Sequence, residues 1–213
     1  MATYSSIAHN FTPPDASTST SVHQGAGVMK LIKTIDSDGS DSTISFVNGA
    51  SSVVLDGTYN TYIFKLINIH PESDDAYLKF QCSTDGGSNY NTSCTASFNA
   101  AYNLEDDSGS GGPSYDTNLD LQTGTGFMAI GYGASNINDA CEVSILTLFS
   151  PAQTTYVKHF TIWGNGNLKN SIHGNNNNFA AGFFNTTSAI NAIQFKFASD
   201  EIQGGSIKMY GVA

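Results

Sequence analysis

The sequence predicts an all-β protein, an antiparallel β-sandwich of jelly-roll type with about ten strands and an extended N-terminal arm. Short runs of β-branched and aromatic residues recur along the chain, and turn residues interrupt them about every eight to twelve residues. Gly, Ser, Thr and Asn are abundant, and no tract of Ala, Leu, Glu and Lys favours a helix. A chain of 213 residues is long enough to bury the core of one such domain.

Residues 58–80 predict the centre of the fold. Residues 59–70 carry apolar side chains on both faces of an extended chain, so we expect a central strand that is covered on both sides. Pro71 and the Ser and Asp residues that follow it end this strand. Residues 76–82 alternate apolar and polar side chains, which indicates a second strand with one buried face. We expect the two strands to pair as a β-hairpin, followed by the Asp-Gly-Gly turn at 85–87.

Residues 1–27 have little apolar content and are expected to form an extended or flexible arm, whereas residues 28–213 form a single sandwich domain. The Gly-, Ser- and Asp-rich residues 104–115 and the Asn-biased residues 165–178 are expected to form surface loops. Further strands are expected at 28–35, 43–47, 127–132, 142–149, 156–163, 179–184, 190–197 and 206–212.

The charge of the chain argues against two classes of partner. The formal net charge is −10, and all eight basic residues are lysines, none of which lies between Lys79 and Lys158. Nucleic-acid binding needs a basic patch, and anionic membranes attract basic segments, so we expect neither partner. No apolar run is long enough to span a membrane, and the N-terminus lacks the basic and apolar regions of a signal peptide.

The three cysteines, Cys82, Cys94 and Cys141, are too few for a disulfide scaffold. Cys82 and Cys94 flank the turn at 85–87 and could face each other across a hairpin. Buried free thiols that act as small apolar side chains are the favoured alternative. Free thiols fit assembly in a reducing cytoplasm.

A metal site is the first chemistry to consider. Asp36, Asp38 and Asp41 alternate with small residues and could give oxygen ligands to a hard cation. Their spacing is not that of an EF-hand, and a solvated turn is the more common role for such residues. The acidic residues at 74–75 and 105–107 are interpreted in the same way.

Catalytic residues find no support in the sequence. The five histidines lack zinc-site spacing, and we expect His70 and His159 to lie at or in strands with structural roles, packed together or capping a ladder. No G-x-S-x-G motif is present. A glycosidase pair of carboxylates can meet through space, but nearly all the acidic residues fall in Gly- and Ser-rich loops. We therefore expect a non-enzymatic protein without catalytic residues, cofactor or metal.

A glycan-binding surface is the main functional alternative. Sandwiches bind sugars with exposed aromatic rings beside Asn and Asp, and Trp163, Tyr90, Tyr102 and Tyr115 lie near Asn-rich stretches. Single aromatic residues in a sandwich are nevertheless more often part of the core.

Several segments in order are similar to a family of poorly characterised virion structural proteins of tailed bacteriophages, many of them marine. The resemblance covers about Met29 to Gly211 and is carried by Leu55–Tyr59, Ile63–Lys65, Ile67–Pro71, Thr154–Phe160, Ala181–Ile190 and Gly205–Gly211. The family supplies no catalytic residues. We expect this chain to diverge from it most at residues 105–115 and 174–178.

The resemblance implies a non-enzymatic protein on the exterior of a virion, assembled in the cytoplasm of the host bacterium. A capsid decoration or cement protein is the leading expectation, with the major capsid protein or tail proteins as partners and a homo-oligomer, commonly a trimer, as the assembled form. Residues 1–27 would then be an arm that orders on its neighbours. The alternative is a tail or fibre module that binds host surface glycans through Trp163 and the loop at 165–178.

Overall fold

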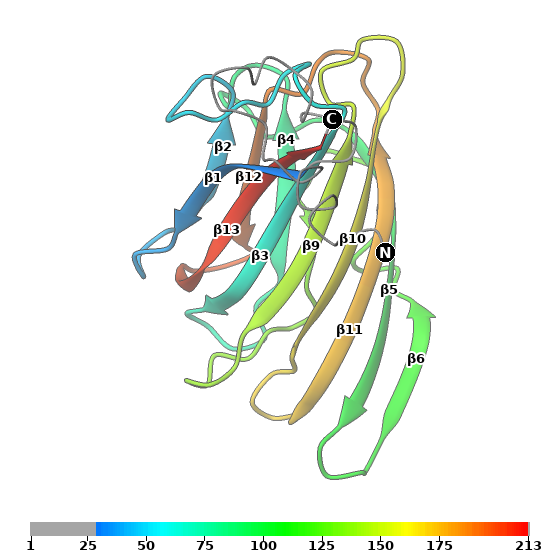
Figure 1. Ribbon diagram of the computed structural model, residues 1–213. Coiled ribbons are helices and arrows are strands. Elements are labelled where there is room, and N and C mark those ends of the chain that lie inside the picture. Colours follow the sequence, from blue (N-terminus) through cyan, green and yellow to red (C-terminus); the bar gives the residue numbers. More distant parts are fainter. Residues whose placement is uncertain (1–28, 213) are drawn as a thin grey trace, which may run out of the picture.

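The computed structural model describes residues 29–212, which fold into two antiparallel sheets with strands only (Figure 1). This confirms the all-β sandwich expected from the sequence. The arm expected at 1–27 lies outside the described residues. Thirteen strands are present in the described range, against the ten or so expected. The additional three, Cys94–Leu104, Ser110–Tyr115 and Leu121–Gly124, lie in the polar part of the sequence between the expected strands at 76–82 and 127–132.

The larger sheet holds nine strands and the smaller sheet four. In spatial order the larger sheet contains β1 (Met29–Asp36), β13 (Ile202–Val212), β3 (Thr61–Pro71), β9 (Glu142–Phe149), β10 (Lys158–Asn167), β11 (Gly174–Phe184), β5 (Cys94–Leu104) and β6 (Ser110–Tyr115), with β7 (Leu121–Gly124) also paired to β5. The smaller sheet contains β2 (Ile44–Val47), β12 (Ala192–Phe197), β4 (Leu78–Ser83) and β8 (Met128–Ala129).

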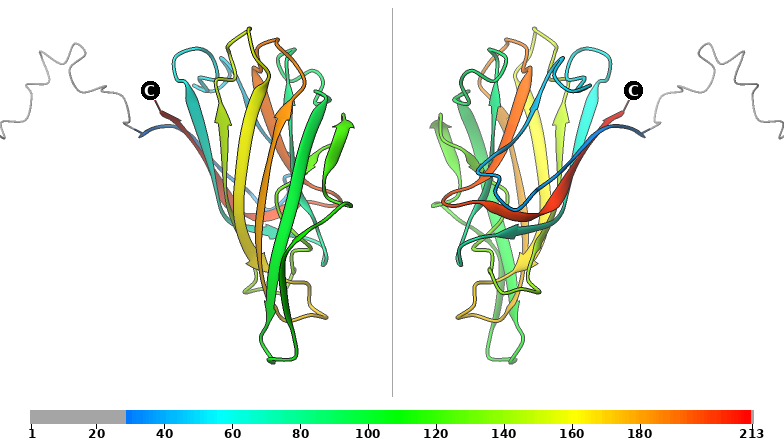
Figure 2. Two further views of the ribbon diagram at one scale, coloured as in Figure 1. Left: turned by 90° about the vertical axis from the view of Figure 1, so that its right-hand side faces the viewer. Right: turned by 90° about the vertical axis from the view of Figure 1, so that its left-hand side faces the viewer.

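Eight of these strands form a jelly roll. The order β1-β13-β3-β9 in one sheet faces the order β2-β12-β4-β8 in the other, and the chain passes from sheet to sheet at each step from β1 to β4. This interleaving is that of two Greek keys wound into a double sheet. The remaining strands β10, β11, β5 and β6 widen the larger sheet on one side, so that the β5–β6 hairpin extends beyond the smaller sheet (Figures 1 and 2).

The hairpin predicted at 58–80 is wrong. β3 pairs with β13 and β9 in the larger sheet, whereas β4 pairs with β12 and β8 in the smaller one. Alternation identifies the buried face of a strand but not its partner, and both strands bury one face in the same core from opposite sheets.

The predicted cover on both faces of β3 is also wrong, because Ile63, Lys65 and Ile67 on its outer face are only half-buried. An irregularity at Asn68, which has a φ of 52°, then turns Ile69 toward the core.

The two predicted polar loops are largely strands. β5 continues through Leu104 and returns as β6, and β10 and β11 leave only residues 168–173 between them. The Asn tract at 174–178 therefore lies inside β11, with β10 on one side and β5 on the other. Asn has a poor intrinsic strand preference, but ladders of backbone hydrogen bonds on both sides decide the conformation here.

A cluster of phenylalanines joins the two sheets across the core. Phe80 of the smaller sheet has its ring centroid 5.1 Å from that of Phe160 and 5.9 Å from that of Phe184, both in the larger sheet. Phe46 of β2 lies 5.5 Å from Phe64 of β3 in the same way. These edge contacts between fully buried rings tie the sheets together.

Phe80→Ala should therefore lower the free energy of unfolding by about 3–5 kcal/mol, because it removes a fully buried ring and leaves a cavity between the sheets. Chemical denaturation followed by far-UV circular dichroism measures the change. Phe179→Ala is the matched control, since this ring is exposed on the outer face and its loss should cost much less. Equal costs for the two variants would contradict the assignment of Phe80 to the centre of the core.

Candidate functional site

The outer face of the larger sheet is open to solvent over β9, β10 and β11. Residues in these strands alternate between buried and exposed, so every second side chain points away from the core. Several outward side chains are large and apolar, including Val143, Ile145, Trp163 and Phe179. Exposed apolar side chains gathered on one face mark a candidate binding surface.

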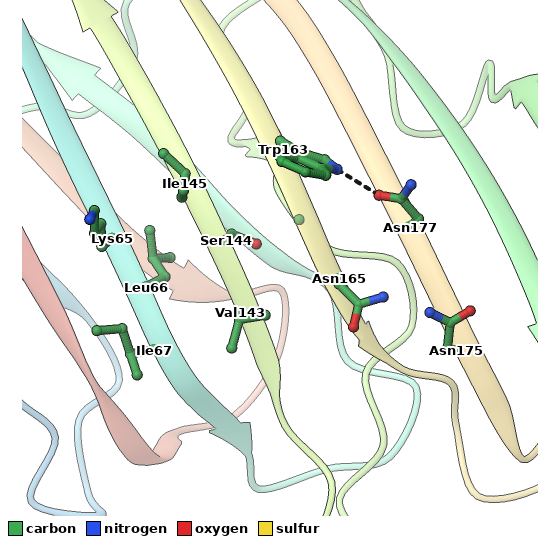
Figure 3. A pocket seen from close by; sticks show the side chains of 11 residues that line it. Lys65, Leu66, Ile67, Val143, Ser144, Ile145, Trp163, Asn165, Asn175 and Asn177 are labelled. Atoms are coloured by element: carbon green, nitrogen blue, oxygen red, sulfur yellow. Dashed lines mark hydrogen bonds between the residues drawn. The ribbon is translucent and has the colours of Figure 1, made fainter.

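Trp163 is the most prominent side chain of this face. It is 66% exposed, so the core role that is more common for an aromatic residue in a sandwich does not apply to it. Its indole Nε1 donates a 2.8 Å hydrogen bond to Oδ1 of Asn177 on the neighbouring strand. Figure 3 shows the indole extending from β10 toward Asn177 on β11. The bond holds an exposed ring in one orientation, which lowers the entropy lost when a ligand stacks on it.

A hollow of about 590 Å³ lies beside the indole on the same face. Three amide side chains, Asn165, Asn175 and Asn177, line it together with aliphatic groups of β3 and β9 (Figure 3). Lys65 is its one charged lining residue, and the Lys65 Nζ lies 5.3 Å from the centroid of the Tyr210 ring. The hollow thus offers an aromatic ring for stacking and amides for hydrogen bonds with a neutral polar ligand.

The other aromatic candidates lie elsewhere. Tyr115 is exposed on β6 at the far side of the same sheet, where its hydroxyl donates a 2.6 Å hydrogen bond to Asp120. Tyr102 pairs with the buried Asn176 and so lies on the inner face of the sheet, and Tyr90 is half-buried beside Gly87. The sequence predicts that the amides at 174–178 lie in a loop, whereas in the structure they are strand residues of β11. Their alternation between exposed and buried positions depends on a strand assignment that composition did not suggest.

The acidic and histidine candidates have local roles. Asp38 and Asp41 accept hydrogen bonds from backbone N–H groups of their own turn, at 3.0 and 3.1 Å, as expected of a solvated turn. Among residues 29–212, no group of three His, Cys, Asp or Glu side chains is placed to hold a metal ion. His70 Nδ1 lies 2.8 Å from the carbonyl oxygen of Ala140, whereas His159 lies 5.6 Å from the Phe183 ring. The two histidines therefore do not pack against each other.

The cysteines are free, as favoured from the sequence. Cys82 and Cys94 are buried, but they lie in opposite sheets and not across a hairpin. Burial raises the pKa of Cys94 to about 12 and that of Cys82 well above its usual value, so both thiols stay protonated. Cys141 is half-buried.

A buried carboxyl lies on the inner face behind the hollow. Gly164 and Gly166 of β10 carry no side chain, and Ser144 and Glu142 of β9 fill the space over them. The Glu142 carboxyl lies against Gly131 and is fully buried, and neither of its oxygens has a hydrogen-bond partner of ordinary geometry. Loss of solvation raises the pKa of Glu142 from 4.5 to about 8, and the nearby Tyr132 N–H lowers it by less.

The bond between Trp163 and Asn177 leads to a first prediction for this face. Asn177→Ala removes the acceptor of the indole N–H, so the ring should gain freedom and the fluorescence anisotropy of Trp163 should fall. Trp163 is the one tryptophan of the chain, so the signal has a single source. Asn175→Ala, two residues away on the same exposed side of β11, is the control and should leave the anisotropy unchanged. An unchanged anisotropy in Asn177→Ala would show that packing and not this bond holds the ring.

Glu142 leads to a second prediction, on pH. Because its pKa is higher in the folded protein than in the unfolded chain, its stabilising effect is full below about pH 4.5 and is lost as the pH rises through about 8. Glu142→Gln keeps the shape and cannot ionise, so it should unfold at a higher temperature than the parent at pH 9. The gain should be on the order of a few kcal/mol.

At pH 5 the two proteins should differ little. Glu105→Gln, the same change at an exposed position, should leave the pH profile of stability unaltered. Thermal unfolding across this pH range measures all three proteins. Parallel profiles for the parent and Glu142→Gln would contradict a protonated Glu142 in the folded state.

Comparison with protein-family models, with curated proteins and with solved structures gave no match. Within residues 29–212 there is also no helix with the length and apolar character needed to cross a membrane.

Proposed function

We propose that this protein is a non-enzymatic structural protein on the exterior of a bacteriophage particle, a capsid decoration or cement protein. Its partners are the major capsid protein or tail proteins and further copies of itself, with a trimer as the assembled form. The observation that carries the proposal is the spatial arrangement of the segments that resemble virion proteins.

Three of those segments are loops that gather at one end of the sandwich. Leu55–Tyr59 precedes the start of β3, Thr154–Phe160 leads into β10, and Ala181–Ile190 runs out of the end of β11. The pairs Thr61↔Phe149 and Lys158↔Phe184 show that the ends of these strands lie together at one end of the larger sheet. Met29, where the described chain begins, pairs with Val212 at the same end. A contact site made by this end lies next to the point where residues 1–28 join the domain.

This end presents an exposed aromatic residue above loops that are joined by hydrogen bonds. Tyr156 is 73% exposed and lines a hollow of about 580 Å³ together with Phe149 and Thr187. Beneath it, the buried Lys158 donates hydrogen bonds from Nζ to the carbonyl oxygens of Tyr156 and Thr186, at 2.8 and 3.2 Å. The lysine ties two of the three loops together. Exposed tyrosines on a fixed backbone are frequent anchors of protein interfaces.

A reconstruction of the particle that carries this protein tests the proposal. We expect density for the sandwich on the outside of the capsid lattice, with the end that contains Tyr156 against its neighbours. Density inside the portal channel or against the packaged DNA would overturn the proposal. Density on the tail or on a fibre would move the assignment from the head to host attachment.

The contact itself can be tested by substitution. Tyr156→Ala should fold with unchanged stability, because its side chain is exposed, and its incorporation into particles should fall about tenfold. Quantitative mass spectrometry of purified particles measures the copy number relative to the capsid protein. Trp163→Ala, an exposed aromatic residue on the face and not on the end, is the matched control and should be incorporated normally. Normal incorporation of Tyr156→Ala would exclude this end as the contact.

A second candidate function is the binding of host surface glycans by a tail or fibre module. The specific observation in its favour is the exposed indole of Trp163, fixed by Asn177 and bordered by a hollow with three amide side chains. Such sites usually bind a sugar in two ways. An aromatic ring stacks on the face of the sugar, and side-chain amides form hydrogen bonds with its hydroxyl groups. The two functions use different surfaces of the domain, so one protein can perform both.

A further inference from the structure

The outer face carries a straight line of large side chains that runs across the strands. The register pairs Ile145 of β9 with Trp163 of β10, Trp163 with Phe179 of β11, Phe179 with Asn99 of β5, and Asn99 with Tyr115 of β6. The four large apolar members of this line are between 41% and 66% exposed. Neighbouring strands lie about 4.8 Å apart, so the line is about 19 Å long.

Polar groups border the line on both sides. On one side lie the amides of the hollow beside Trp163, Asn165 and Asn177. On the other side the next outward row consists of Thr161, Ala181 and Ser97, small residues that form the floor of a second hollow of about 480 Å³. The large side chains thus form a ridge with the amides of Asn165 and Asn177 along one flank and the hydroxyl groups of Thr161 and Ser97 along the other. The exposed Val143 widens the ridge beside Ile145.

Charged groups are nearly absent from this surface. Lys65 is the one charged residue that lines the first hollow, and His159 and Tyr115 are the titratable residues of the second. Among residues 29–212, no carboxylate lines either hollow, although the chain has a net charge of −10. Asp120 contacts this row of side chains at its end, where its carboxylate accepts a hydrogen bond from the hydroxyl group of Tyr115. Within the part of the chain that the structure describes, the row from β9 to β6 therefore offers no positive group to an acidic ligand and no negative group to a basic one apart from Asp120 at its end. The positive groups come beyond Ile145, where Lys65 of β3 and Lys208 of β13 continue the row.

These features select a linear ligand over a protein partner. The core of a protein interface is a contiguous apolar patch, whereas the outward neighbours of Trp163 along β10 are Thr161 and Asn165, and Phe179 has Asn177 beside it on β11. Ile145 has the exposed Val143 beside it on β9, so the apolar surface is wider only at that end of the ridge. A polysaccharide presents a ring with apolar faces and a rim of hydroxyl groups at every unit. The strand spacing of about 4.8 Å is close to the length of one pyranose unit in an extended chain.

We propose that the outer face binds a neutral, extended oligosaccharide of about four sugar units that lies across strands β9, β10, β11, β5 and β6. Trp163 is the principal stacking platform, with Phe179 and Tyr115 as further platforms along the chain. Asn165 and Asn177, in the next outward row, bind its hydroxyl groups. This proposal rests on the glycan-binding function given above as the second candidate and adds to it the charge, the length and the direction of the ligand.

The test begins with the purified protein on an array of neutral and acidic glycans. The fluorescence of Trp163 is then titrated with β-1,4-linked gluco- and manno-oligosaccharides, from the disaccharide to the hexasaccharide, and with oligogalacturonates as the acidic series. For one neutral series we expect the affinity to rise about tenfold or more from the disaccharide to the tetrasaccharide and then to level off. The acidic series should bind more weakly at every length.

Variants locate the chain on the face. Trp163→Ala, read by calorimetry, should abolish binding at all lengths. Tyr115→Ala should weaken the tetrasaccharide about tenfold and leave the disaccharide unchanged, because Tyr115 lies three strands from Trp163. Tyr156→Ala, exposed at the end of the sandwich, is the matched control and should bind like the parent.

The outcomes separate the two claims. If no glycan on the array binds, the glycan-binding function and this proposal both fail. Three results would overturn the neutral chain across the strands while glycan binding stands. They are that the acidic series binds best, that the affinity does not depend on length, or that Tyr115→Ala has no selective effect on the tetrasaccharide.

Discussion

The structure depends on one constraint, that a wide sheet is covered on one face only. Phe80 and its neighbours join the four strands of the smaller sheet to the larger one, and every strand at this junction must place alternate side chains in the shared core. The remaining side chains of β9 and β10 point to the opposite face of the larger sheet, where no part of residues 29–212 packs over them. Residues such as Trp163 and Asn177 therefore do not have to fit into a packed core. The strands that carry them are fixed by the buried side chains on the inner face of the sheet.

The same constraint explains which parts of the fold could be predicted. β9 was predicted with its observed bounds, Glu142–Phe149, because its alternation is regular and Pro151 follows it. The pairing of β3 and β4 could not be predicted, because residues 72–77 carry ordinary turn residues but take the chain from one sheet to the other. In a jelly roll, neighbours in sequence often face each other across the core, and the hydrophobic pattern of each strand is the same whichever sheet it joins.

The candidate site was harder to predict than the fold. Trp163 was identified as a candidate platform, but the Asn tract beside it was assigned to a loop, because composition alone favours turns for Asn. In the structure its residues alternate, with Asn176 and Asn178 buried and Asn175 and Asn177 exposed. The buried pair satisfies part of its own hydrogen bonding, since Asn178 Nδ2 donates to Asn176 Oδ1 and Asn176 Nδ2 donates to the Tyr132 carbonyl. This network depends on residues more than forty positions apart, which no local pattern reveals.

The geometry of the sheet relates the two proposed surfaces to each other. Tyr156 lies at the ends of the strands, whereas the line from Ile145 through Trp163 to Tyr115 crosses them at right angles. If the end that contains Tyr156 rests on a particle, the strands stand away from the particle surface and the line lies parallel to it. A glycan bound along that line can then continue past β6 at the edge of the sheet, or in the other direction over β3 and β13, without meeting the particle. The end of the sandwich can therefore attach to the particle while its outer face binds a glycan. The two contacts do not interfere, because one lies at the ends of the strands and the other lies across their outer face.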